Sequence, residues 1–574
     1  MRELEALPLL GPLLCAFWSL AWLLPNHARP WAAFHTDAWI AAGLCVALVW
    51  IAWKARDGWR LSPTAGFLLL LSFVPWIQWA FGLVTLPGIA MMSSLFLLGL
   101  ALSFSLGENW SKQDRAMPVV FVLAAAGFAG YISVGLQLYQ WVGLTERDGA
   151  TDIWVLYFGG RGRPDANLGQ PNQLATLQLW ALLAVAWALH RKAIGTLGVV
   201  LGALPLLFGV ALTQSRTAVL ILTLWLAVSW LFARRKFFSR GWLLGSTALY
   251  AGFLAMLFLV NPLARTLGLE AAPALSERFD VGLRLPAWRM FVDAITERPW
   301  LGYGWDQTRW AMFEVFPRHP ELAGMPFSHA HNLFLDLLLW LGLPLGGLLC
   351  LALLVWMTIR FVHIRSAEQV LVFAALLAMA LHAMLELPLH YAYFLLPTGV
   401  LAGALRQMQS PQPKSAVMRR SILLALGCTA AMLLAILIRD YLRVEENHLA
   451  LRFDNQGVGT VHDRNPPDTW LLEHWRGVME LSRLAPHRGM TDEEVDRWRD
   501  LAIYHSSGIN LQNMLTVLSL NGRHEEAEFW AVRVCAVFDP ATCELIVKRW
   551  RESQSHQIES VLASPDALAL GRES

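Results

Sequence analysis

The sequence predicts an all-α polytopic membrane protein, and two observations carry that prediction. Of its 574 residues, 56% are hydrophobic and only 15% are charged, and the mean hydropathy is +0.45. Soluble domains carry about 25% charged residues, so this composition indicates a lipid environment. Many segments also reach the roughly 20 apolar residues that a helix needs to cross a bilayer. The net charge of +2 says little about partners, and we expect no nucleic acid among them.

About thirteen segments have the length and apolar character of membrane-spanning helices. The first of them lacks a small-residue cleavage motif of the A-x-A kind, so we expect an anchor rather than a removable signal. The expected spans are 6–24, 37–53, 64–82, 84–105, 117–139, 172–189, 195–212, 216–233, 241–260, 333–356, 368–384, 391–405 and 421–438.

Positive charges alternate along the loops and predict the orientation. Lys and Arg cluster in every second loop, for example at 191–192, 234–240 and 406–420, whereas the short loops between them carry almost none. The positive-inside rule places the charged loops in the cytoplasm. An odd number of spans then puts the N-terminus inside and the C-terminal region outside. The long loops 140–171 and 261–332 also fall outside, which in a bacterium is the periplasmic face of the inner membrane.

Composition divides the chain into three parts. An N-terminal transmembrane bundle (1–139) has short loops and little chemistry. A transmembrane catalytic core (140–440) holds both long loops and nearly every unusual polar residue. The remainder (441–574) is soluble in character, and we expect a periplasmic helical domain there. It is either a small cap on the membrane body or a docking surface for a protein partner.

The C-terminal part has apolar residues at the three-and-four spacing of helices, in pairs that resemble a TPR stack. Thr491 followed by Glu494 predicts a capping box at a helix N-terminus. Cys535 and Cys543 lie in a compartment that we expect to be oxidising, where they either form a disulfide or stay as two free thiols. The expected helices are 471–485, 491–507 and 524–538.

A dense polar cluster stands directly before an apolar helix in GGRGRPDANLGQPNQLATLQLW, residues 159–180. Its candidate substrate-binding residues are Arg163, Gln170, Asn172 and Gln173. The cluster is either an ordinary solvated loop or part of a site. Because polar groups at membrane depth are costly and usually functional, we favour the site.

Two arginines are candidates for binding an anion. Arg216 lies at the external end of two apolar spans that almost no loop separates. Arg284 lies near the start of an expected amphipathic helix in GLRLPAWRMFVDAITERPWLGYGWDQ, residues 282–307. Taken alone, Arg216 is explained equally well as a snorkelling interface arginine. Arg284, taken alone, is better explained as a surface charge on an interfacial helix.

The stretch SHAHN, residues 328–332, stands where a long apolar run begins. His329 and His331 are two residues apart, so they do not share a helix face, which argues against a metal pair of the i, i+4 kind. One of them can point inward while the other faces water. Ser328 and Asn332 are able to cap the following helix, so the alternative is a polar cap with incidental histidines.

The last external turn before a span, in LHAMLELPLHYAYFLLPTG, residues 381–399, adds further polar groups. Tyr391 and Tyr393 are candidate binding residues, although tyrosines at that depth are usually interface anchors. Glu386 is harder to explain in that way, because a carboxylate near the membrane needs a partner.

All of these stretches fall on the same side of the membrane, and this coincidence predicts one external site. The sequence shows no P-loop, dinucleotide fingerprint, DxD-type metal motif or Ser-nucleophile elbow. We therefore expect neither ATP nor NAD, and no cofactor or metal. Guanidinium groups bind phosphate in a bidentate way without a metal, so such a site beside lipid suits the diphosphate head group of an anionic lipid.

Three motifs resemble the O-antigen ligase and polymerase superfamily. HNLFLDLLLWLGLPLGG is similar to its HN-x-x-L signature, and GLRLPAWRMFVDAITERPWLGYGW resembles the stretch that precedes that signature. GRPDANLGQPNQLAT is similar to the short motif of bacterial protein O-oligosaccharyltransferases, the pilin glycosylation ligases. The C-terminal region also resembles that branch.

The resemblance implies en bloc transfer of a preassembled glycan from undecaprenyl diphosphate to a Ser or Thr hydroxyl of a periplasmic protein such as pilin. It assigns the essential histidine to His331, which would act either as general base or as a diphosphate ligand. It assigns the essential arginines to Arg216 and Arg284, which would bind the charge of the leaving diphosphate in place of Mg²⁺.

The same resemblance assigns groups that would orient the sugar or the acceptor. The loop glutamine of the motif matches Gln170, with Gln173 close by in the sequence. The late tyrosine matches either Tyr391 or Tyr393.

Three alternative functions are open at this point. An O-antigen ligase would use a lipid A–core sugar as acceptor, and an O-antigen polymerase would extend another lipid-linked glycan. Both would share the histidine and the arginines. A transporter of lipid-linked sugars belongs to a different class, but its polar groups would gather near the bilayer midplane in paired repeats. We therefore favour the oligosaccharyltransferase.

Overall fold

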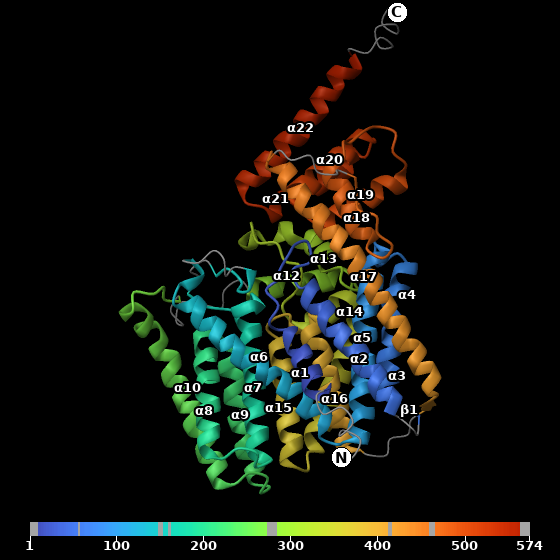
Figure 1. The fold of residues 1–574 in the computed structure, drawn as a ribbon. Coiled ribbons are helices and arrows are strands. Elements are labelled where there is room, and N and C mark those ends of the chain that lie inside the picture. The colour runs from blue at the N-terminus through green and yellow to red at the C-terminus, as the bar shows by residue number, and fades with distance from the viewer. Residues whose placement is uncertain are drawn as a thin grey trace, which may run out of the picture. The chain divides into compact units, whose positions relative to one another are not determined.

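The structure, a computed structural model, describes residues 10–54, 58–146, 153–158, 162–272, 284–410, 416–458 and 465–562. It is almost entirely helical (Figure 1), which confirms an all-α polytopic membrane protein. A helix pairs all its backbone groups internally, as a lipid environment requires. Two short strands, β1 (Trp59–Leu61) and β2 (Ala416–Met418), pair in antiparallel fashion.

Ten helices among the described residues are long and apolar enough to cross a membrane. Each coincides with one of the expected spans. The total of about thirteen stays a prediction. The expected spans outside this set coincide with other helices: 6–24 with α1 (Leu10–Leu20), 368–384 with α15 (Ala367–Ala383) and 391–405 with α16 (Ala392–Gln409).

The chain forms two compact units, and each is described by itself. Unit 1 contains Met1–Ser72, Leu95–Asp280 and Ala352–Ala435, and unit 2 contains Phe73–Ser94, Val281–Leu351 and Ile436–Ser574. The division falls within three helices: α5 (Pro87–Gln113), α14 (Leu333–Val362) and α17 (Arg420–Asn455).

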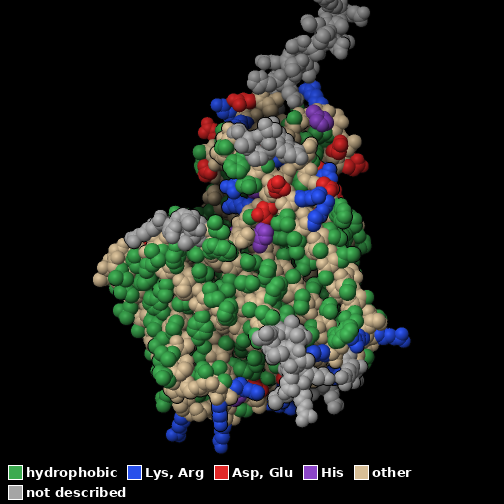
Figure 2. Space-filling model, viewed as in Figure 1, with side chains coloured by type: hydrophobic (Ala, Val, Ile, Leu, Met, Phe, Trp, Pro, Cys, Tyr) green, Lys and Arg blue, Asp and Glu red, His purple; other side chains and the backbone are tan. Residues whose placement is uncertain are grey.

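Unit 1 is a helical bundle whose further elements are α2 (Phe34–Lys54), α3 (Pro63–Leu71), α6 (Met117–Trp141), η1 (Leu144–Glu146), η3 (Ala166–Leu168), α7 (Pro171–His190), α8 (Thr196–Thr213), α9 (Arg216–Ala233), α10 (Arg240–Thr266) and η6 (Pro388–His390). Helix α7 packs against α6, α8 and α15, and α16 packs against α2 and α15. Trp18, Trp180 and Phe394 are fully buried in its core. Figure 2 shows hydrophobic side chains over the flank of this bundle and Lys and Arg side chains at its lower edge.

Unit 2 holds, besides parts of α5, α14 and α17, the elements α4 (Val74–Ala80), α12 (Arg284–Glu297), α13 (Thr308–Val315), η4 (Phe316–Arg318), η5 (Pro320–Leu322), α18 (Glu473–Arg483), α19 (Asp492–Tyr504), α20 (Gly508–Leu520), α21 (His524–Val537) and α22 (Pro540–Leu562). Helix α12 confirms the expected amphipathic helix.

Helix α13 contacts the C-terminal helices of unit 2. The ring of Trp310 in α13 lies 5.5 Å from that of Trp530 in α21, and Arg309 donates a hydrogen bond to Ser506 at 2.9 Å. Burial lowers the pKa of Arg309.

The C-terminal helices largely follow the sequence pattern. Helices α18, α19 and α21 confirm the three expected helices, and Thr491 and Glu494 form the expected capping box. A disulfide joins Cys535 and Cys543, which decides between the two alternatives. Helix α20 was missed because buried residues lie on most of its faces, so its sequence lacks a clear polar stripe. The TPR-like character of the C-terminal helices stays a prediction.

Helix α14 is broken at Gly342, which has φ 72° and ψ 175°. The turn after α12 fits into this break, where the Tyr303 N–H donates to the Leu339 carbonyl at 2.7 Å. Gly302 in that turn has φ 69°. A Cβ on either glycine would lie 2.4 Å from a backbone oxygen of the opposite segment, so neither position accepts a side chain. The two sequence motifs PWLGYGW and HNLFLDLLLWLG therefore fold against each other.

Candidate active site

In unit 1, the GRPDANLGQ loop (162–170) is folded around the side chain of Gln140. The Gln140 oxygen accepts the N–H groups of Asp165 and Ala166 at 3.1 and 2.7 Å. Its amide nitrogen donates to the carbonyls of Leu156 and Ala166 at 2.9 and 3.0 Å. Gln140 is 1% exposed, so this one amide pairs backbone groups that would otherwise be buried without partners.

Asn167 holds the same loop to two other segments, one around Leu23 and His27 and one at Trp154–Leu156. Its amide nitrogen donates to the carbonyls of Leu23 and Trp154 at 2.7 and 2.9 Å, and its side-chain oxygen accepts the Leu156 N–H at 3.0 Å. His27 Nε2 lies 2.8 Å from the Asn167 carbonyl oxygen, and burial lowers the pKa of His27. The polar residue at this position of the motif therefore serves the fold of the loop.

The end of the loop leads into the start of α7, where Gln173 lies beside both predicted tyrosines. Gln170 caps α7 by accepting the Gln173 N–H at 2.7 Å. The Gln173 side-chain oxygen accepts the hydroxyl of Tyr393, and Tyr391 also hydrogen-bonds to Gln173. The two tyrosine rings lie 5.2 Å apart. Tyr393 is 2% exposed whereas Tyr391 is half-buried, so of the two only Tyr391 is accessible to a substrate.

A chain of polar contacts connects Arg163 with two further turns of unit 1. Its Nε donates to the Thr213 carbonyl at 2.9 Å, and its guanidinium lies 3.5 Å from the Asn172 side-chain oxygen. Asn172 in turn donates to the Glu386 carboxylate at 3.1 Å. Arg216 is the first residue of α9, directly after the short connection from Thr213; the sequence predicted two spans with almost no loop between them. Asn172 is thus the polar partner that we expected for Glu386, a carboxylate near the membrane.

Asp37 in α2 stabilises the start of α16. Its Oδ1 accepts the Ala392 N–H at 2.7 Å, directly beside Tyr391. A carboxylate at a helix N-terminus is favourable because it meets unpaired N–H groups and the positive end of the helix dipole. Asp37 is 4% exposed, so it acts as a structural support for the tyrosine pair.

In unit 2, the SHAHN loop (328–332) begins α14. Asn332 accepts the N–H groups of Phe334 and Leu335 at 3.0 and 3.2 Å, which confirms the predicted cap. His331 has φ 51°, in the left-handed region. That conformation costs a non-glycine residue roughly 1–3 kcal/mol, so neighbouring contacts must offset it. His331 itself is half-buried.

The peptide of Ala330, between the two histidines, is hydrogen-bonded on both sides. Its N–H donates to Asp336 Oδ1 at 2.9 Å, and its carbonyl accepts the Trp288 indole N–H at 3.0 Å. Thr308, the first residue of α13, contacts α14: its hydroxyl is 3.5 Å from Asp336 Oδ1 and accepts the Trp340 indole N–H at 2.8 Å. The loop backbone is therefore fixed from both α12 and α14.

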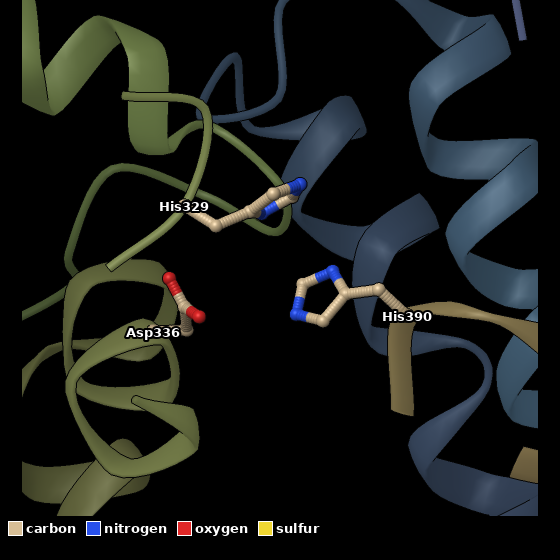
Figure 3. Close-up of side chains that lie close together, drawn as sticks. All are labelled: His329, Asp336 and His390. Carbon is tan, nitrogen blue, oxygen red and sulfur yellow. The ribbon is translucent and has the colours of Figure 1, made fainter. Parts of the chain in front are cut away.

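Figure 3 shows His329 and Asp336, which both belong to unit 2. His329 Nδ1 lies 4.0 Å from Asp306 Oδ1, and Asp306 also adopts a left-handed conformation, with φ 60°. His390, which the figure also labels, lies in η6 of unit 1. The His329 side chain therefore lies beside one residue with a left-handed backbone, Asp306, and His329 is two residues before another, His331.

The predicted residues fall into two sets, one in each unit. In unit 2, Arg284 is the first residue of α12, one turn before Trp288, which contacts the SHAHN loop. His329 and His331 lie on that loop. The set in unit 1 gathers near the start of α7 and consists of Arg163, Gln170, Asn172, Gln173, Arg216, Glu386, Tyr391 and Tyr393.

The residues that support these sets were not predicted as site residues. Gln140, Asp37 and Asp336 are all polar groups inside or beside apolar stretches. Polar groups at membrane depth default to functional hypotheses, and this signal would have found all three. Trp288 gave no such signal, because an indole in an amphipathic helix is ordinary.

Comparison with known families and proteins gives concordant results. Residues 201–352 match the family described as O-Antigen ligase, and residues 370–548 match Virulence factor membrane-bound polymerase, C-terminal. The General O-oligosaccharyltransferase of Acinetobacter baylyi (strain ATCC 33305 / BD413 / ADP1) is 30% identical over 519 residues, which are 89% of each chain. This chain belongs to the O-oligosaccharyltransferase family. The ComP-specific O-oligosaccharyltransferase of the same strain is 26% identical over 423 residues, 72% of this chain and 74% of that protein.

Membership in the O-oligosaccharyltransferase family, within the O-antigen ligase superfamily, confirms the resemblance drawn from the motifs. The chain is therefore a glycosyltransferase and a multi-pass membrane protein. Since both relatives are named for O-oligosaccharyl transfer, the ligase, polymerase and transporter alternatives are not favoured.

Proposed function

We propose that this oligosaccharyltransferase moves a preassembled glycan en bloc from undecaprenyl diphosphate to Ser or Thr hydroxyls of periplasmic proteins such as pilin. The observation that carries the proposal is the 30% identity to a general O-oligosaccharyltransferase over 89% of both chains. In this scheme, residues 1–139 form a supporting bundle, residues 140–440 the catalytic core and residues 441–574 a periplasmic domain.

The proposed location is the bacterial inner membrane, with the N-terminus in the cytoplasm and the reacting groups in the periplasm. Lys and Arg gather at one edge of unit 1, as the positive-inside rule requires of a cytoplasmic edge. The disulfide between Cys535 and Cys543 fits an oxidising compartment for the C-terminal helices.

We assign the general base to His331. Histidine is the side chain that most often acts as a general base, and an imidazole nitrogen can accept the proton of the acceptor hydroxyl. As that proton leaves, the acceptor oxygen forms a bond to the anomeric carbon, and the bond from that carbon to the diphosphate oxygen breaks. One displacement of this kind inverts the anomeric configuration. Diphosphate is a good leaving group, so no strong general acid is needed.

The leaving diphosphate gains negative charge, and we assign its stabilisation to Arg216 and Arg284. Arginine binds phosphate oxygens in a bidentate way and stays charged at every relevant pH, so it can replace a metal ion in this role. Arg163 is a further phosphate or sugar ligand, because its contacts with Thr213 and Asn172 already fix its direction.

The remaining predicted residues would orient the sugar and the acceptor. Tyr391 is the preferred late tyrosine, since it is accessible whereas Tyr393 is buried. Asn172 and Glu386 form a hydrogen-bonded pair that can bind sugar hydroxyls. Gln170 and Gln173 support this surface of unit 1 through the α7 cap and the tyrosine contacts. In unit 2, His329, which lies beside Asp306, is a further candidate binding residue.

The test uses a strain that lacks this gene and still makes the lipid-linked glycan. Wild type, His331→Ala and the control His319→Ala would be expressed in it. His319 is also in unit 2, where it pairs with Asp293 at 3.2 Å. Intact-mass spectrometry of pilin and other periplasmic proteins would be read beside a lipopolysaccharide gel. We expect a glycan mass on protein with the wild type and with His319→Ala, and a loss of at least 100-fold with His331→Ala.

Unmodified proteins together with a restored long-chain lipopolysaccharide ladder would contradict the proposal and favour the ligase or polymerase. Protein glycosylation that persists at the wild-type level in His331→Ala would keep the reaction but remove His331 from it.

A further inference from the structure

The peptide of Ala330 is the point where two distant parts of unit 2 meet the SHAHN loop. Asp336, from the first turns of α14, accepts its N–H at 2.9 Å. Trp288, from α12, donates to its carbonyl at 3.0 Å. The Ala330 N–H lies in the peptide group that joins His329 to Ala330, and its carbonyl lies in the peptide group that joins Ala330 to His331. The two bonds therefore hold the backbone on both sides of Ala330, directly before the strained backbone of His331.

We propose that Asp336 and Trp288 are positioning residues that hold His331 in its left-handed conformation and so aim its imidazole at the acceptor. This inference rests on the proposed role of His331 as base. A general base needs a directed hydrogen bond to the proton it removes, so a small rotation of the loop is enough to slow transfer.

Ordinary helix capping does not explain Asp336. Asn332 already accepts the N–H groups of Phe334 and Leu335, which are the usual targets of a cap. The Asp336 bond instead reaches back six residues to Ala330 and closes a ring that encloses His331 and Asn332. A residue in that ring cannot change its φ without breaking the bond or moving the start of α14.

The carboxylate of Asp336 is itself held in place. The side chain is completely buried, with 0% exposure. Its Oδ1 lies 3.5 Å from the Thr308 hydroxyl, which accepts the indole N–H of Trp340 at 2.8 Å. Trp340 is four residues further along α14, so the support of Asp336 comes from rigid helix rather than from the loop.

Complete burial also separates this role from catalysis. A side chain that no solvent or substrate reaches acts through the groups it binds, which include the Ala330 N–H and the Thr308 hydroxyl. The role needs an acceptor oxygen in this place and does not need a negative charge. Asparagine supplies that oxygen with nearly the same shape, whereas leucine removes it.

The experiment compares purified enzymes in lipid nanodiscs. The donor is the lipid-linked glycan extracted from the strain described above, and the acceptor is the protein that the wild type modifies. We expect Asp336→Leu to lower kcat by 30-fold or more and Trp288→Phe by about tenfold, with the KM values for both substrates within twofold of wild type. Asp336→Asn should stay within about threefold of the wild-type kcat.

Trp310→Phe is the matched control for Trp288→Phe. It removes the same ring atoms and N–H in the same unit, but the Trp310 indole N–H has no acceptor among the described residues. It should leave kcat unchanged. Thermal midpoints of all variants would be measured in parallel. We expect Trp288→Phe and Trp310→Phe to have equal thermal midpoints, and only Trp288→Phe to have a lower kcat than the wild type.

Three results would overturn the inference. Equal inactivity of Asp336→Asn and Asp336→Leu would show that the carboxylate charge matters. Wild-type kcat in Trp288→Phe and Asp336→Leu would show that the two bonds do not position the base. Wild-type transfer by His331→Ala would remove the base on which the inference rests, and this third result alone also contradicts the proposed function of His331.

Discussion

The GRPDANLGQ loop of unit 1 and the SHAHN loop of unit 2 both place polar residues before a long apolar helix. In both, a side chain from outside the loop pairs with the loop backbone, Gln140 in the first and Asp336 in the second, yet the candidate residues of the two loops differ in what they contact. In the first, polar side chains such as Asn167 and Gln170 turn to the backbone and hold the loop together. In the second, Asp336 and Trp288 from outside the loop hold the backbone, and the histidine side chains stay half-buried at its surface.

The difference shows that a polar motif does not reveal which of its residues are reactive. A side chain that already pairs with buried backbone groups is committed to the fold, because withdrawing it leaves those groups unpaired. A side chain on a loop whose backbone is held by others can turn to a substrate. The four predictions that follow test this division, from the largest expected effect to the smallest.

Gly342→Ala should disrupt the support of the SHAHN loop. Alanine at φ 72° is strained, and its Cβ would lie 2.4 Å from the Trp300 backbone oxygen. We expect a loss of about 2–5 kcal/mol in stability and little active protein. Thermal midpoint and yield in detergent would measure it. Gly347→Ala, in the same helix with nothing within 4 Å of the added Cβ, is the control. Equal midpoints for both variants would contradict the packing of the turn into α14.

Gln140→Leu should loosen the GRPDANLGQ loop. The change leaves the N–H and C=O groups that Gln140 pairs without partners in a buried place, which costs about 3 kcal/mol in total. Proteolysis of the loop should become faster and the thermal midpoint should fall. Leu138→Ala, an exposed change two residues earlier, is the control. Unchanged proteolysis in Gln140→Leu would show that this loop is not held by α6.

Tyr393→Phe and Tyr391→Phe should separate support from reaction. Loss of the buried Tyr393 hydroxyl leaves the Gln173 oxygen short of a donor, so stability should fall by about 1 kcal/mol. Tyr391→Phe also removes a hydrogen bond to Gln173, but from a half-buried hydroxyl that water can replace, so stability should fall by less than in Tyr393→Phe, whereas kcat/KM should fall by roughly tenfold if this hydroxyl contacts substrate. Midpoints and steady-state rates would be compared. The opposite pattern would make Tyr393 the reacting tyrosine.

Acidification should weaken the GRPDANLGQ loop slightly through His27. Burial lowers the pKa of this imidazole in the folded protein, so it stays neutral there while the unfolded chain takes up a proton near the ordinary value. The stability from His27 is present above that value and is lost as pH falls below it. Hydrogen exchange of the loop at pH 7.5 and 5.5 would show this as a small decrease in protection. His27→Gln should abolish the pH dependence, and an unchanged dependence would exclude His27 as its source.

Much of the fold followed from the sequence because local patterns determine it. The apolar runs predicted the spans, the charge alternation predicted the orientation that we propose, and Asn332 predicted its own cap. The site residues could be named by their type and their place beside the membrane. The sequence could not tell which of Tyr391 and Tyr393 is accessible to a substrate. Exposure depends on the side chains that pack nearby, and these come from other segments of the chain.

What the sequence determined by itself was therefore the helical membrane class, the family and the set of polar residues that a site can use. The tertiary structure alone decided which of them are committed to the fold. Trp288 and Ala330 are 42 residues apart, and Gln140 and Ala166 are 26 apart. Hydrogen bonds at such separations leave no periodic trace in a sequence, because they depend on how whole helices pack and not on the spacing of residues within one helix.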